Sequence, residues 1–231
     1  GYFTSPVAYV FIVIFLILAG VFTFPLSDFF ARNEASLNAF FFWHCWLYLF
    51  LVPAVGMRLW SEERRQGTIE LLLTMPVTGW QAIVGKFLAS WLFLGLALAL
   101  TFPMVITVNY LGSPDNGVIF CGYLGSFLMA GAYLAVSCLT SAITRSQVVS
   151  FILSVVLCLA LVMAGWPPLN DMLSQWFSSG MINAVASISV MTHFSQFQRG
   201  IVDSADIVFF LGLIFFCLFT TGVVIRSYRA G

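Results

Sequence analysis

The chain has 231 residues, of which 61% are hydrophobic and only 8% are charged. A soluble globular domain carries about 25% charged residues, so this chain has too few charges to cover a surface that faces water. Its nine basic and nine acidic residues cancel, which leaves no overall charge to attract nucleic acid, and lipid must surround much of the chain.

Charge-free gaps of about 20 apolar residues predict membrane helices. Six gaps qualify, and together they predict an all-α, polytopic membrane protein with a single domain over residues 1–231. Pro53 and Pro103 lie inside two of these helices and are expected to kink them. The expected spans are residues 7–24, 39–57, 79–110, 118–143, 148–166 and 207–225.

The charges predict how the spans are oriented. With a cytoplasmic N-terminus, seven of the nine basic residues fall on the cytoplasmic side, as the positive-inside rule favours. A seventh span through the polar residues 172–198 would move Arg226 and Arg229 outside, so we expect six spans and two cytoplasmic termini. Residues 167–206 then form a long outer segment, predicted to hold one or two short helices in the outer leaflet or dipping into it as a re-entrant segment.

The loop between the second and third spans is the most charged segment of the chain. Ser61 is expected to cap a turn that begins with Glu62 and Glu63, because acidic side chains are favourable at the start of a helix. Gly67 is expected to interrupt this turn.

A second, amphipathic helix is expected over residues 69–75, with Thr68 as its cap and Leu72 facing the membrane or the bundle. Thr78 and Gln81 fit a capping box at the start of the third span. The alternative is a solvated loop with leucines at the interface. The side chains expected to face the cytoplasm or a partner are Glu63, Arg64 and Glu70.

Two ionisable residues lie within the expected spans. Lys86, two turns into the third span, is expected to extend its stem to the cytoplasmic interface as an anchor. His44 lies in the outer half of the second span and is a candidate intramembrane polar site, although a neutral histidine bonded within the bundle is the alternative. The spans contain no chain of acidic residues, which argues against a proton-coupled pump.

Two segments resemble a known family. Residues 63–78, ERRQGTIELLLTMPVT, followed by Gly85 and Lys86, resemble the signature of the type-2 ABC exporter permeases. Residues 2–9, YFTSPVAY, resemble the opening of the gliding-motility type of bacterial ABC permease subunit. Members of that family carry an amphipathic helix before the first span, which residues 1–6 do not provide, so we expect a preceding segment to be missing from this sequence.

The resemblance implies a fold and a role. It implies six spans, outer re-entrant helices, and a coupling helix at about residues 61–75 that docks on a separate ABC ATPase subunit, with Lys86 at the base of the third span. The residues that it assigns to ATPase coupling are Glu62, Glu63, Arg64, Arg65, Gly67, Thr68, Glu70 and Leu72.

The resemblance also implies partners. It implies a second permease subunit, in a homo- or heterodimer, with an extracytoplasmic auxiliary subunit as a further candidate. The place implied is the inner membrane of a bacterium.

Motifs for chemistry within the chain itself are missing. The phosphate-binding pattern GxxxxGK[ST] does not occur, so we expect no cofactor in this chain, and ATP and Mg²⁺ on the partner ATPase. No cluster of His, Cys and Asp and no nucleophile–base pair lies at one membrane depth, so no catalytic or metal-binding residue is predicted and an embedded enzyme is disfavoured. The second hypothesis is a membrane subunit that transmits force to an envelope machine without moving a substrate.

Overall fold

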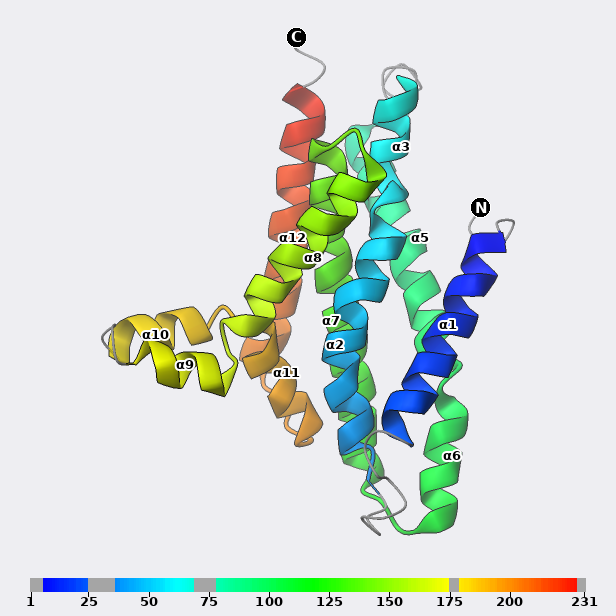
Figure 1. Ribbon diagram of the computed structural model, residues 1–231, viewed down its shortest axis with the longest axis vertical. Helices are drawn as coiled ribbons and strands as arrows, with labels where there is room; N and C mark the ends of the chain where they lie inside the picture. The colour runs from blue at the N-terminus through cyan, green and yellow to red at the C-terminus, as the bar shows by residue number, and fades with distance from the viewer. Residues whose placement is uncertain (1–5, 25–35, 69–77, 175–178, 228–231) are drawn as a thin grey trace.

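The computed structural model describes residues 6–24, 36–68, 78–174 and 179–227. Every regular element within those ranges is an α-helix, and the longer helices form one elongated bundle (Figure 1). This confirms the predicted all-α class for the described part of the chain. The helices are α1 (Pro6–Thr23), α2 (Asn38–Gly56), α3 (Arg58–Gln66), α5 (Gly79–Ala99), α6 (Phe102–Leu111), α7 (Asn116–Ile143), α8 (Gln147–Met163), α9 (Pro167–Leu173), α10 (Ser179–Ala186), α11 (Val190–Gln198) and α12 (Ser204–Ser227).

Four helical stretches in the described ranges are long and apolar enough to cross a membrane. They are Asn38–Gln66, Gly79–Leu111, Asn116–Ile143 and Ser204–Ser227. The predicted first and fifth spans coincide with α1 and α8, whose 18 and 17 residues rise about 26–27 Å against a hydrocarbon layer of about 30 Å. Crossing by these two shorter helices stays a prediction.

The centre of the bundle is α7, on which α2, α5, α8, α11 and α12 all pack. Glycines permit the close approach of the neighbouring helices. A Cβ atom added to Gly122 would lie 2.5 Å from Phe41 of α2, and one added to Gly131 would lie 2.7 Å from Trp91 of α5. Residues 128–138 are all buried, so α7 provides the core against which the other helices are positioned.

The third predicted span is interrupted. Pro103, which lacks an N–H group, lies in the first turn of α6, and two residues separate this helix from α5. The Thr101 hydroxyl in this break lies 2.8 Å from the Tyr123 hydroxyl of α7. The expected kink at Pro103 is therefore confirmed, and α5 and α6 together form the candidate membrane-spanning stretch Gly79–Leu111. The capping box predicted at the start of α5 is present, because Thr78 and Gln81 exchange side-chain to backbone hydrogen bonds.

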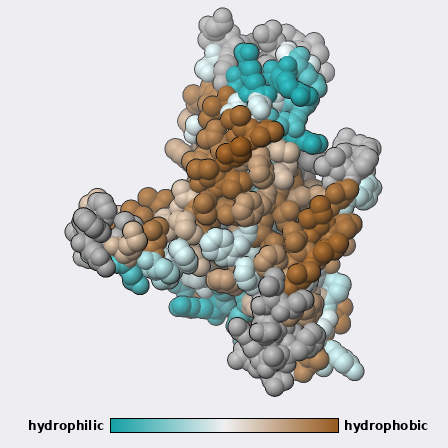
Figure 2. Space-filling model, viewed as in Figure 1, coloured by the Kyte–Doolittle hydropathy of each residue, from teal (hydrophilic) through white to brown (hydrophobic). Residues whose placement is uncertain are grey.

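The predicted outer segment, residues 167–206, contains three short helices in its described part. Figure 1 shows α9 and α10 as a hairpin that projects sideways from the bundle, whereas α11 returns alongside it. Re-entry of this segment into a membrane stays a prediction. Hydrophilic residues gather at the α3 end of the molecule, and the middle of the visible face is mostly hydrophobic (Figure 2).

Candidate functional site

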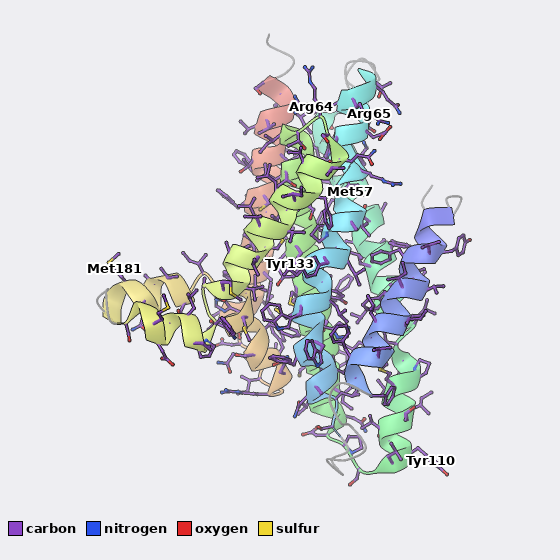
Figure 3. The ribbon with its side chains drawn as sticks, viewed as in Figure 1. Met57, Arg64, Arg65, Tyr110, Tyr133 and Met181 are labelled. Carbon is purple, nitrogen blue, oxygen red and sulfur yellow. The ribbon has the colours of Figure 1, made fainter. Side chains whose placement is uncertain are left out.

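The joint between α2 and α3 is held by a serine of α7. The Ser141 hydroxyl accepts hydrogen bonds from the backbone N–H groups of Trp60 at 2.9 Å and Ser61 at 3.0 Å, and donates one of 2.9 Å to the Met57 carbonyl. These three bonds use the full capacity of a hydroxyl. A Cβ atom added to Gly56 would lie 2.3 Å from the nearest side chain of α7. The joint at Met57 (Figure 3) is therefore packed tightly on α7.

The predicted start of this helix was wrong. The helix α3 begins at Arg58, so Ser61 lies inside it, is buried, and donates its hydroxyl hydrogen to the Met57 carbonyl one turn earlier. Gly67 does end the helix, with a φ angle of 69° that favours glycine. The predicted second helix over residues 69–75, with Glu70 and Leu72, lies outside the described residues.

Lys86, a residue of α5, connects α5 to α3. Its ammonium group forms an ion pair with Glu63, donates a 2.9 Å hydrogen bond to the Leu59 carbonyl, and lies 4.1 Å from the centroid of the Trp60 ring. The Trp60 side chain is fully buried, and its indole N–H donates to the Cys138 sulfur of α7 at 3.2 Å. Lys86 was predicted as an interfacial anchor, but its charge is bound by groups of α3.

Arg64 of α3 binds the end of α7. Its guanidinium donates to the carbonyl of Ala142 at 2.8 Å and to that of Ile143. The last carbonyls of a helix have no partner within the helix and carry its partial negative charge, so a guanidinium is favourable there.

Glu62 of α3 binds the start of α8. Its carboxylate accepts a hydrogen bond from the side chain of Gln147, the first residue of α8. It also accepts hydrogen bonds of 2.7 Å from Arg65 and of 2.7 Å from Gln66, both in its own helix. A carboxylate at a helix N-terminus complements the partial positive charge there. Glu62 and Arg64 thus contact both sides of the turn between α7 and α8, with charges that match the two helix ends.

The prediction for the outward face of α3 needs correction. Glu63 and Arg64 were expected to face the cytoplasm or a partner, yet both are half-buried and bind other helices of this chain. The exposed residues of α3 are Arg58, Arg65 and Gln66. Arg65, labelled beside Arg64 in Figure 3, makes its ion pair only with Glu62 in the described ranges and keeps 63% of its side chain exposed.

His44 lies in a buried aromatic environment. Its ring is fully buried, its Nδ1 atom donates to the Phe40 carbonyl at 2.7 Å, and its centroid lies 5.8 Å from that of Phe15 and 5.1 Å from that of Tyr48. The Nε2 atom and the Tyr48 hydroxyl have no hydrogen-bond partner among the described residues. A functional role for His44 stays a prediction.

Sequence reasoning missed a pair at the other end of the bundle. His193 of α11 and Asp206 of α12 approach to 2.5 Å between Nδ1 and Oδ1, and the histidine Nε2 lies 2.9 Å from the Ser187 carbonyl. Because a carbonyl only accepts, the Nε2 N–H is the donor in the contact with Ser187. Nothing in the sequence spacing of Asp206 reveals a partner on another helix, so the sequence did not predict this pair.

The described residues contain no group of three or more His, Cys, Asp and Glu side chains that could hold a metal ion. What they show is a bundle of apolar helices with a polar helix at one end that is fastened to α5, α7 and α8. Together these features define a helical integral membrane protein in which the polar helix α3, at one end of the bundle, is bound to the apolar helices.

The family of the chain follows from its sequence. The family described as ABC-2 family transporter protein matches residues 48–201, about two thirds of the chain. The chain belongs to this family. It is therefore a permease component of an ABC transporter. This family is a family of membrane transport components and not of catalysts, and its members associate with an ABC ATPase subunit. No curated protein matches the chain.

Proposed function

We propose that this chain is the permease subunit of a bacterial ABC exporter in which α3 receives the motion of a separate ATPase subunit. The observation that carries the proposal is the fastening of α3 to three helices. It binds α5 through Lys86, α7 through Ser141 and Arg64, and α8 through Glu62. A displacement of α3 is therefore passed to three membrane helices at once.

The contacts divide α3 into two working faces. The inward face, with Glu62, Glu63 and Arg64, transmits force to the bundle. The exposed face, with Arg65, leads in sequence to residues 69–75 and docks on the ATPase subunit. In the proposal, Glu70 and Leu72 belong to this docking part, as the sequence-based expectation also has it. The proposal differs from that expectation in that Glu63 and Arg64 do not touch the partner directly.

The proposed topology has six crossings, with α3 on the cytoplasmic side of a bacterial inner membrane and residues 167–206 as an outer re-entrant gate. In support, six of the seven basic residues in the described ranges are at the α3 end. They are Arg58, Arg64, Arg65, Lys86, Arg145 and Arg226.

The proposed assembly pairs this chain with a second permease subunit and two ATPase subunits that bind ATP and Mg²⁺. An extracytoplasmic auxiliary subunit is a further candidate partner. The resemblance at residues 2–9 favours the gliding-motility subgroup.

The test uses the chain together with the ABC ATPase that co-purifies with it in mild detergent, reconstituted in liposomes. Glu63→Lys places two cations together and should lower the permease-dependent change in ATPase rate about fivefold, equivalent to about 1 kcal/mol, while the ATPase subunit still co-purifies. The double variant Glu63→Lys with Lys86→Glu restores opposite charges and should recover much of the coupling. Arg226→Lys, at the exposed end of α12 and outside α3, is the control.

Two results would overturn the proposal: full coupling in Glu63→Lys, or no ATPase subunit with the wild-type chain. Two observations together would favour the force-transmitting alternative over export. The ATPase rate would respond to no transported compound, and an envelope machine would lose force in Glu63→Lys.

A further inference from the structure

A groove of about 350 Å³ lies in the wedge between α8 and α12. Leu139 of α7 contributes to its back wall, Ala160 and Leu213 contribute to the walls from α8 and α12, and Val185 of α10 lines it on the side of the projecting hairpin. Both α8 and α12 pack on α7, and the groove lies between them.

Short side chains keep this wedge open. Ala160 and Ala164 of α8 both line it, and residues four apart lie on the same face of a helix. A larger apolar residue at either position would extend into the groove. The short side chains of α8 therefore help to form the groove.

The chemistry of the groove suits hydrocarbon alone. Every lining side chain is aliphatic or aromatic apart from the thiol of Cys217. A polar or charged ligand would lose its hydrogen bonds to water and gain almost none, which costs several kcal/mol. Leu213 and Cys217 lie near the middle of α12, a helix long and apolar enough to span a membrane, so the groove faces the hydrocarbon layer.

The size of the groove decides between the apolar occupants. One turn of an α-helix with its side chains, about 10–12 Å wide and 5.4 Å long, fills roughly 400–600 Å³. This exceeds the volume of the groove, so a helix from a second copy of the chain would enter it with side chains only and not with its backbone. A single slender hydrocarbon chain does fit, and the volume lies within the range of about 300–1,000 Å³ that is usual for ligand pockets.

We propose that this groove is a binding site for one acyl chain of a bilayer phospholipid. The bound chain touches Val185 and Ile188 on the side of the hairpin and Leu213 on α12. Because α10 packs chiefly on α9 and has few contacts of its own with the bundle, the lipid chain supplies the apolar contact that holds the hairpin against α12. The site is separate from α3 and needs no ATPase subunit to be occupied.

The test is photolabelling of the purified full chain in nanodiscs that contain a phospholipid with a diazirine in its acyl chain, followed by mapping of the labelled residues. In the wild type, label should concentrate on the groove residues of α8, α10 and α12. Ala160→Phe fills the groove and should lower that label about fivefold or more. Val156→Phe is the matched control, because Val156 lies one turn earlier on α8, is 56% exposed and does not line the groove.

Label in the groove that is lost in Ala160→Phe and kept in Val156→Phe supports the proposal. Equal labelling in both variants overturns it, as does a wild-type pattern spread evenly over the lipid-facing helices or a cross-link from the groove to a second copy. If Ala160→Phe does not fold, Ala164→Leu fills the groove from its other end and is held to the same outcomes. Because the assay contains no ATPase, its failure leaves the proposed permease function untouched.

Discussion

The two ends of the molecule each join helices through a pair of ionisable side chains, but the pairs have different surroundings. At the α3 end, Glu63 and Lys86 keep 26% and 24% of their side chains exposed, and Lys86 has further partners in α3. At the other end, His193 and Asp206 are only 17% and 7% exposed. In both pairs one carboxylate oxygen, Oε2 of Glu63 or Oδ2 of Asp206, is buried without a hydrogen-bond partner in the described ranges, so burial and the further partners of Lys86 make the difference.

This difference indicates different consequences of damage. At the α3 end, several polar contacts to α5, α7 and α8 share the task, so losing one leaves the others in place. At the other end, one buried pair provides the polar link between α11 and α12 that the structure shows. Removing one partner of a buried pair leaves the other without compensation, which costs more than losing an exposed pair. The outer pair should therefore govern stability, and the α3 contacts should govern coupling.

The largest expected effect is that of Asp206→Ala. The substitution leaves His193 Nδ1 without its partner, and we expect the free energy of unfolding to fall by about 2–3 kcal/mol, below the 3–5 kcal/mol of a fully buried pair because His193 is partly exposed. The measurement is thermal unfolding of the detergent-solubilised chain. Asp171→Ala, which removes an exposed acid of α9, should change stability by no more than about 0.5 kcal/mol. Equal losses in the two variants would contradict a structural role for the pair.

The second effect is that of Ser141→Ala at the joint of α2 and α3. The backbone N–H groups of Trp60 and Ser61 lose their acceptor in a buried place, so we expect a loss of about 1–2 kcal/mol. Ser137→Ala is the control one turn earlier, since the Ser137 hydroxyl donates only to the Tyr133 carbonyl of its own helix. A loss as small as that of the control would mean that Ser141 does not hold the joint.

Local features such as a capping box and a proline break were predictable from the sequence, although the start of α3 was not, and contacts between distant segments were not predictable. The capping box of Thr78 and Gln81 depends on residues three apart, and the break near Pro103 follows from a missing N–H group. By contrast, Ser141 lies 80 residues from Ser61, and nothing in its local sequence separates it from other serines of α7. The inward direction of Glu63 likewise depends on where α5 places Lys86, which only packing decides.

The third prediction concerns the strength of the pair at the α3 end. A double-mutant cycle of Glu63→Gln and Lys86→Gln should give a coupling energy of about 1 kcal/mol, because a partly exposed pair gains little beyond solvent-screened attraction. Chemical unfolding of the four proteins in detergent provides the measurement. A coupling energy near zero would show that the Leu59 carbonyl and the Trp60 ring hold Lys86 without Glu63.

The smallest effect on stability is expected at Arg65, and its neighbour provides the contrast. Arg65→Ala removes a mostly exposed side chain whose ion pair is with Glu62 of the same helix, so no measurable change in unfolding is expected. Arg64→Ala removes the group that binds the last carbonyls of α7 and should cost about 1 kcal/mol. If the exposed face of α3 docks on the ATPase subunit, Arg65→Ala should weaken co-purification of that subunit, and Arg64→Ala should leave it bound but poorly coupled. The reverse pattern would place docking on the inward face, and the two adjacent arginines therefore separate the surface that binds a partner from the surface that moves the bundle.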